Sequence, residues 1–171
     1  QQAIQAYETS GYLERVTGAI GNLGFTYAAL GLYMQSCRLT NKALEIDRSM
    51  GAKLSMSYWL ENLFDAELRL GWVDLARKHL DEFTALTPDC GSSRITVSQH
   101  MNFGLMALGE SKAADAVQHF KTAVELAKEE EAGNLNVALC YLAHAHLTNN
   151  EAAEALKAST QATDLHRQQG Y

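Results

Sequence analysis

Proline is almost absent from this chain, which has one in 171 residues. Runs of Val and Ile are also scarce, whereas Ala, Leu, Glu, Lys and Gln are plentiful. Strands favour β-branched and aromatic residues, and helices favour the residues that are abundant here. The composition therefore predicts an all-α protein.

Basic stripes, long apolar runs and paired cysteines are missing as well. Lys and Arg total 14 against 20 Asp and Glu, so we expect no direct nucleic-acid partner. No apolar run approaches the roughly 20 residues of a membrane-spanning helix, and no signal peptide is visible. The three cysteines are far apart and fit neither a disulfide framework nor a zinc pattern, which favours a reducing, cytoplasmic location.

Several residue types recur at a common period of 40. The glycines of this series are Gly11, Gly51 and Gly91, the asparagines are Asn22, Asn62 and Asn102, and the small or apolar residues are Ala3, Ala43, Phe83 and Ala123. A period shared by independent residue types indicates an array of structural repeats. Because the chain begins Gln-Gln, we expect it to be a window from a longer array.

Apolar residues at helical spacing predict two helices, A and B, in each period. The predicted pairs span 14–30 with 33–49, 53–70 with 73–86, 93–108 with 112–131, and 134–147 with 151–168. Gly31 and Gly51 follow their helices in the position of a C-terminal stop. The dipeptide Thr87-Pro88 is predicted to end its helix at residue 86, since proline disfavours helical geometry in the residue before it.

These units resemble the tetratricopeptide repeat (TPR). That family carries a large residue, Leu-Gly and Tyr on helix A, then Ala, an aromatic residue and Ala on helix B, followed by Pro. The matching residues are Ile20, Leu23, Gly24, Tyr27, Ser36, Thr40 and Ala43; Leu60, Leu63, Phe64, Ala76, Leu80, Phe83 and Pro88; Phe103, Gly104, Ala107, Ala116, Phe120 and Ala123; and Leu139, Leu142, Ala143, Ala155 and Ala162. Glu67 and His146 depart from the pattern, because they stand where Tyr is usual.

The period of about 40 resembles the long TPR variety of kinesin light chain, of Leu-Gly-Asn-type adaptors and of bacterial multidomain regulators. The resemblance implies a right-handed superhelical array of antiparallel helix pairs, a TPR solenoid whose A helices form a concave groove. We expect one array fragment over 1–171. Its parts are a remnant helix B in 1–11 and four units at 12–51, 52–91, 92–133 and 134–171.

Glycines at positions 18, 21 and 24 could indicate either a phosphate-binding loop or close helix packing. A phosphate loop needs a preceding strand and a helix that begins at the glycines. Here the three glycines fall within a predicted helix, so we favour packing, most clearly at Gly24. The family phase implies that Gly18 and Gly21 face the groove.

No arrangement typical of catalysis or metal binding stands out. His144 and His146 are two residues apart and point to different faces of a helix, so they cannot share a metal ion. Glu61, Asp65 and Arg69 share a helix face, and a charge ladder is a plainer interpretation than acid–base chemistry. No nucleophile has a base beside it. We therefore expect no enzyme activity, no cofactor and no metal.

The asparagines at the shared phase, Asn22, Asn62 and Asn102, need a separate explanation, since Asn is a middling helix former. The resemblance implies that they line the groove and hold the backbone of a bound peptide. An amide has both a donor and an acceptor and can satisfy an extended backbone. The alternative is that each Asn bonds locally to a neighbouring unit.

Other predicted groove residues are Phe25, Tyr58, Asp65, Arg69, Met101 and Leu105. We expect a protein–protein interaction module that binds a peptide or protein segment, as the regulatory part of a larger protein. Two alternatives stay open: a structural spacer that self-associates through exposed repeat ends, and an accessory segment of an enzyme or transcription regulator. Arg69 alone supplies basic character, so a carboxylate clamp for chaperone tails is not supported.

Overall fold

The computed structural model describes residues 12–90, 92–129 and 134–168, and its secondary structure over these ranges is entirely α-helical. The helices are α2 (Leu13–Ala29), α3 (Tyr33–Met50), α4 (Lys53–Arg69), α5 (Val73–Cys90), α6 (Ser93–Gly109), α7 (Ala113–Glu129), α8 (Leu135–Thr148) and α9 (Ala152–Gln168). The predicted all-α fold of helix pairs is confirmed, with most helix ends within one or two residues of their predicted positions. The remnant helix B predicted in residues 1–11 lies outside the described residues.

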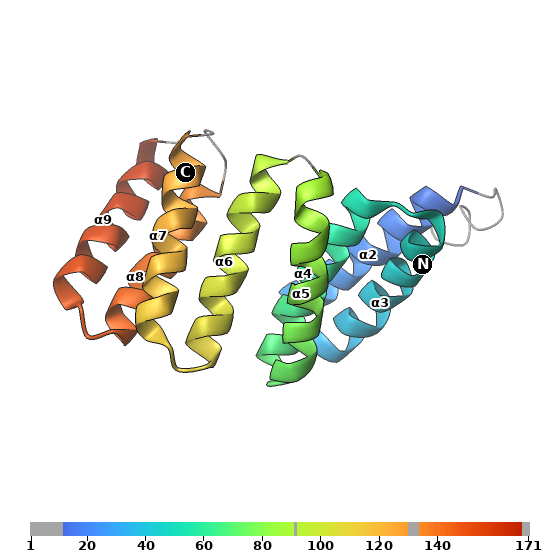
Figure 1. Ribbon diagram of the computed structural model, residues 1–171, viewed down its shortest axis with the longest axis horizontal. Coiled ribbons are helices and arrows are strands. Elements are labelled where there is room, and N and C mark those ends of the chain that lie inside the picture. The colour runs from blue at the N-terminus through green and yellow to red at the C-terminus, as the bar shows by residue number, and fades with distance from the viewer. Residues whose placement is uncertain (1–11, 91, 130–133, 169–171) are drawn as a thin grey trace. The chain divides into compact units, whose positions relative to one another are not determined.

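The chain divides into two compact units, Gln1–Cys90 and Gly91–Tyr171. Within each unit, consecutive helices pack against each other and run antiparallel, as Figure 1 shows. The A helices also meet, because α2 contacts α4 in unit 1 and α6 contacts α8 in unit 2. Each unit therefore has a layer of A helices and a layer of B helices.

The described A helices all end in the same turn. A residue with positive φ follows each of them: Gly31 (75°), Gly71 (74°), Ser111 (62°) and Asn150 (61°). Its N–H donates to the carbonyl three residues back, and the next N–H donates to the carbonyl five residues back at 2.8–2.9 Å. This pair of bonds is the Schellman motif, which satisfies carbonyls that the helix end leaves open. The motif repeats every 39 or 40 residues and places each B helix against its A helix.

The prediction that α5 ends before Pro88 is wrong. The helix continues to Cys90 with Pro88 inside its last turn. Proline lacks an N–H and removes one backbone hydrogen bond, but only two residues follow it here, so little helix is disrupted. Thr87 Oγ1 donates to the Phe83 carbonyl at 3.0 Å within the same turn.

The core of unit 1 is built from side chains that are fully buried, among them Ile20, Leu44, Leu60, Leu63, Phe64, Leu80 and Phe83. The prediction that Leu63 is a core residue is therefore confirmed. In unit 2, Phe120 occupies the corresponding centre, with Leu139 and alanines of α7, α8 and α9 around it. Phe103, predicted to be a core residue as well, is only half-buried. Its ring lies 6.3 Å from that of His100 and 5.3 Å from that of His119 instead.

The three glycines within α2 differ in how closely other side chains and helices approach them. A Cβ at Gly24 would lie 2.5 Å from Thr40 Oγ1 and 3.3 Å from backbone atoms of α3, so the predicted close approach is confirmed. A Cβ at Gly21 would lie 2.3 Å from the Trp59 ring. Gly21 is thus buried between α2 and α4, and the prediction that it faces the groove is wrong. A Cβ at Gly18 would meet nothing within 4 Å.

We expect Gly21→Ala to destabilise unit 1, because the added methyl group collides with the Trp59 indole. Overpacking typically costs about 1–3 kcal/mol, against a gain of up to about 1 kcal/mol in helix propensity. Gly18→Ala on the same helix is the matched control and should stabilise the protein, since its methyl group enters open space. Urea denaturation of both variants measures the difference. Equal stabilisation by both would contradict the packing of Gly21 on Trp59.

Candidate functional site

The A helices of unit 1 hold six of the nine predicted groove residues. On α2, Asn22 is exposed and the Phe25 side chain is 60% exposed. On α4, Tyr58, Asn62 and Asp65 are half-buried and Arg69 is exposed. We call the surface that carries these six residues the α2–α4 face. All of them are at least partly accessible, and a large aromatic ring at 60% exposure is available for a partner.

Arg69 is held by its own neighbours. Its Nε lies 3.0 Å from Asp65 Oδ2, one turn back on α4, and its guanidinium lies 5.8 Å from the centre of the Tyr33 ring. The Asp65–Arg69 part of the predicted charge ladder is confirmed. An exposed pair of this kind contributes only tenths of a kcal/mol to stability. The Arg69 guanidinium is therefore positioned by Asp65 and Tyr33.

In unit 2 the predicted groove residues lie deeper. Met101 and Leu105 are half-buried and pack against the hydrophobic core. Asn102 is 5% exposed, and among the described residues its Nδ2 has no hydrogen-bond partner. The three asparagines of the period are therefore not equivalent, since Asn22 is exposed and Asn62 half-buried. At Asn102, the Nδ2 group therefore makes no local hydrogen bond to the described residues.

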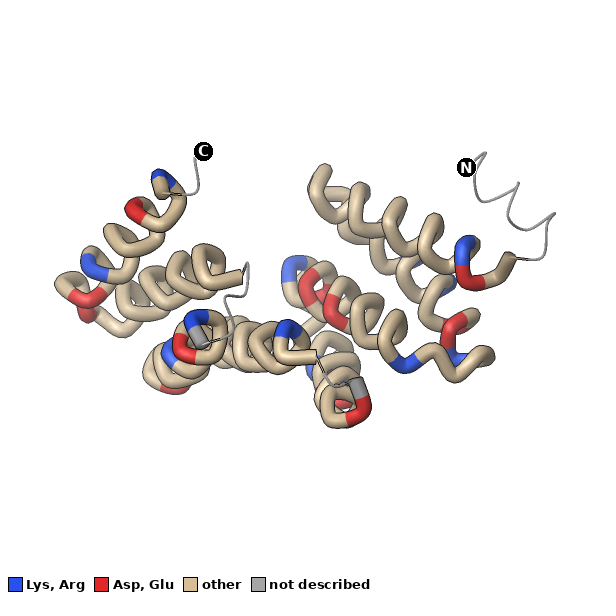
Figure 2. Tube along the Cα trace, turned by 90° about the horizontal axis from the view of Figure 1, so that it is seen from above, with Lys and Arg blue, Asp and Glu red and all other residues tan. Residues whose placement is uncertain are grey.

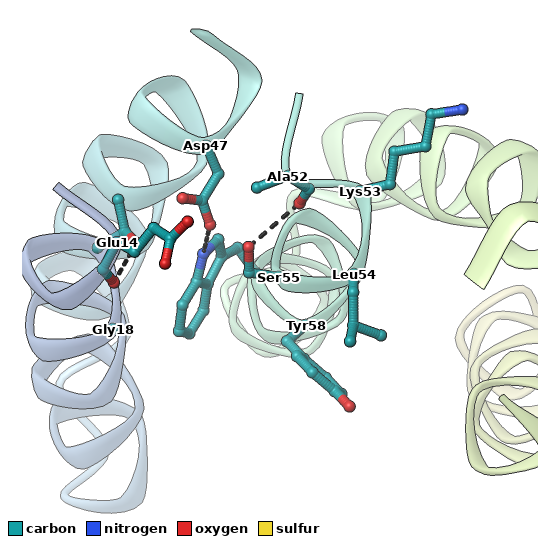
Figure 3. A pocket seen from close by; sticks show the side chains of 10 residues that line it. Glu14, Gly18, Asp47, Ala52, Lys53, Leu54, Ser55 and Tyr58 are labelled. Atoms are coloured by element: carbon teal, nitrogen blue, oxygen red, sulfur yellow. Dashed lines mark hydrogen bonds between the residues drawn. The ribbon is translucent and has the colours of Figure 1, made fainter. Parts of the chain in front are cut away.

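A cavity of about 420 Å³ opens between α2, the end of α3 and the start of α4. Residues that line it include Glu14, Gly18, Asp47, Ser55, Tyr58 and Trp59 (Figure 3). Asp47 is fully buried, and Trp59 Nε1 donates to its Oδ2 at 2.6 Å. The other oxygen, Oδ1, is buried without a hydrogen-bond partner among the described residues. Nothing in the local sequence around Asp47 signals this site, because its partner lies on another helix.

The two departures from the family pattern at the Tyr position are explained by histidine–carboxylate pairs. Glu67 is fully buried, and its Oε2 lies 2.7 Å from Nδ1 of the buried His79. Burial, together with the charge of Glu67, raises the pKa of the Cys37 thiol to about 11. The buried His146 bonds through Nδ1 to the exposed Glu151, and this bond lowers the pKa of that carboxyl group. These histidines have structural partners, as predicted.

Three aromatic side chains lie close together on α6 and α7. His100, Phe103 and His119 lie with ring centres 5.3–6.3 Å apart. Burial, and to a lesser degree the charge of His119, lowers the pKa of His100. Among the described residues, no group of three or more His, Cys, Asp or Glu side chains could hold a metal ion.

Basic residues do not form a tract on the helices that the structure describes. Figure 2 shows Lys and Arg interspersed with Asp and Glu along the described helices of each unit, rather than gathered on one of them. Nucleic-acid-binding proteins concentrate basic residues on one surface. Over the ranges that the structure describes, no helix is long and apolar enough to span a membrane.

Comparison with known proteins identifies the fold but no close relative. No family model matches the sequence, and no curated protein matches it either. Among solved structures, BtubC from P. vanneervenii is similar over 93% of this chain with a TM-score of 0.73 and 16% identity. The apo form of RapI is similar over 94% with a TM-score of 0.71 and 16% identity. A putative kinesin light chain of Podosopora anserina with nearly identical TPR-like repeats is similar over 98%, with a TM-score of 0.66 and 16% identity.

The extent of the match differs among these structures. The chain spans 93% of the kinesin light chain repeat structure but only 66% of BtubC and 48% of RapI. At such low identity, the likeness concerns the path of the backbone. The chain therefore has the fold of a tetratricopeptide-like helical repeat array.

Proposed function

We propose that this chain is a non-catalytic interaction module that binds a peptide or protein segment on the α2–α4 face. The observation that carries the proposal is the exposure of Phe25, at 60%, on a helix layer that also presents Tyr58, Asn22 and Asn62. Exposed aromatic side chains beside polar groups are typical of protein-binding surfaces. The TPR-like fold supports this function, since repeat arrays offer extended binding surfaces.

The asparagines supply the polar part of the proposed contact. Each side-chain amide can donate to a peptide carbonyl and accept from a peptide N–H. Neighbouring helices lie about 8–10 Å apart, and an extended chain advances about 3.3 Å per residue. One Asn per repeat would then meet every third residue of the segment. Asn102 is the corresponding residue of unit 2, where its buried Nδ2 has no partner among the described residues.

The proposal extends to the role and the cellular location of the protein. We infer a regulatory role within a larger protein and a cytoplasmic location. The free thiols of Cys37 and Cys140 support the location. Two alternatives stay in view, a spacer that self-associates and an accessory segment of an enzyme or transcription regulator. Neither has an observation of its own in the described residues.

The proposal is tested with segments selected from a random peptide display library on the whole chain. We expect Asn22→Ala and Asn62→Ala to weaken binding by about 0.5–1.5 kcal/mol for each hydrogen bond lost, measured by fluorescence polarisation. The melting temperature should not fall, because Ala is the better helix former. Asn41→Ala on α3, outside the α2–α4 face, is the control. Unchanged affinity in the Asn22/Asn62 double variant, with a lowered melting temperature, would assign these residues to the scaffold.

A further inference from the structure

We propose that the cavity between α2, α3 and α4 receives a cationic side chain, Lys or Arg, of the bound segment. The inference rests on the proposed function, because it gives one cavity at the α2–α4 face a chemical class of ligand. Its basis is a buried carboxylate with an unpaired oxygen, a second carboxylate beside it, and aromatic walls.

Asp47 is the central residue of this cavity. Its side chain is fully buried, and of its two oxygens only Oδ2 has a donor, the Trp59 indole at 2.6 Å. Oδ1 is without a partner among the described residues. A buried carboxylate is costly unless each oxygen is paired. A positively charged donor entering from the cavity would supply both the missing hydrogen bond and the opposite charge.

Glu14 adds a second negative charge at the same place. Figure 3 shows the Glu14 and Asp47 side chains on one side of the cavity, and Leu54 and Tyr58 on the other. Glu14 is exposed, so it lies at the rim and can meet a ligand as it enters. Two adjacent carboxylates repel an acidic ligand and attract a cation, most strongly where the surroundings are partly dry.

The walls of the cavity also suit a cation. Tyr58 and Trp59 line it, and aromatic faces attract ammonium and guanidinium groups. Gly18 has no side chain, and a Cβ built there meets nothing within 4 Å, so the wall on the α2 side is open. The long, thin side chains of Lys and Arg can carry their charge through such an opening.

Among the described residues that line the cavity, no Lys or Arg side chain points toward Asp47. Lys53 is the one Lys or Arg among the described residues that line the cavity. Its Nζ lies 2.6 Å from Asp89 Oδ2 on α5, and Figure 3 shows its side chain directed away from Glu14 and Asp47. Lys53 is therefore not placed to pair with either of the two cavity carboxylates.

The test uses Trp59 as the reporter. The chain has two tryptophans, and Trp72→Phe leaves Trp59 as the only one, so that the fluorescence reports on the cavity. We expect N-acetyl-arginine amide and N-acetyl-lysine amide to change the Trp59 fluorescence saturably. N-acetyl-citrulline amide has the shape of the arginine probe without its charge, and we expect it to bind at least tenfold more weakly. Equal binding of citrulline and arginine probes would overturn the proposal.

Two variants in the Trp72→Phe background locate the interaction. Glu14→Gln and Asp47→Asn should each weaken binding of the arginine probe at least fivefold. Glu45→Gln, which removes one exposed negative charge from α3 outside the cavity, is the matched control and should change binding less than twofold. Should Asp47→Asn fail to fold by circular dichroism, Glu14→Gln decides alone. Unchanged binding in Glu14→Gln would overturn the proposal.

The outcomes also separate this inference from the proposed function. If selected segments bind the α2–α4 face whether or not they contain Lys or Arg, the cation pocket is wrong and the binding module stands. If the arginine probe binds at Trp59 but no segment binds that face, the pocket stands and the proposed function fails.

Discussion

Leu63→Ala is expected to lower the free energy of unfolding by about 2–5 kcal/mol, the usual range for a buried leucine. Leu63 is 0% exposed in α4, the helix that contacts α2, α3 and α5 within unit 1. The variant removes buried methyl groups and leaves a cavity among side chains that are themselves fully buried. Because repeats are coupled mainly to their neighbours, amide exchange should accelerate first in α3, α4 and α5.

Leu75→Ala provides the control for this prediction. Leu75 lies on α5 in the same unit and is 37% exposed, so its truncation should change the free energy of unfolding far less. Urea denaturation followed by circular dichroism measures both variants. A loss below about 1 kcal/mol for Leu63→Ala would show that the side chain is not in the core.

Removing His79 should have an effect of similar size for a different reason. The Glu67 side chain is fully buried, and His79 Nδ1 lies 2.7 Å from its Oε2. His79→Leu leaves the Glu67 carboxylate without this partner. Breaking a buried pair in this way typically costs about 3–5 kcal/mol, because an uncompensated polar group stays in the interior.

The double variant Glu67→Met/His79→Leu distinguishes pairing from packing. Replacing both members by apolar residues of similar size is often neutral or stabilising, so we expect the double variant to recover most of the loss. Thermal unfolding of the single and double variants provides the comparison. Lys53→Met, which removes an exposed ion pair with Asp89, is the control and should cost no more than about 1 kcal/mol. A double variant as unstable as His79→Leu would contradict the pairing.

The repeat architecture could be predicted because its signals are local and recur. Gly31 and Gly71 mark helix ends at one phase of the period, and both have the positive φ that such a turn requires. Ser111 and Asn150 occupy the same phase with the same backbone conformation, although neither is glycine. The sequence still predicts these two turns, because the helical pattern on either side of them repeats.

The parts that could not be predicted depend on contacts between helices. Gly21 has the spacing of a groove residue, and only the position of Trp59 on the next A helix shows that it is buried. Asp47 forms its hydrogen bond with Trp59 across 12 positions of sequence. Asn102 shares its phase with Asn22 but not its exposure. A periodic sequence indicates where a residue stands within its repeat. Whether that residue is accessible depends on the size of the side chains around it.

The central claim, that the α2–α4 face binds a protein segment, is tested most directly by NMR. The amide spectrum of the chain would be compared with and without a selected peptide at saturating concentration. We predict that the largest shifts fall at Phe25, Tyr58 and Asn62. Shifts confined to the exposed surface of the B helices, around Arg38 on α3 and Lys78 on α5, would contradict the account.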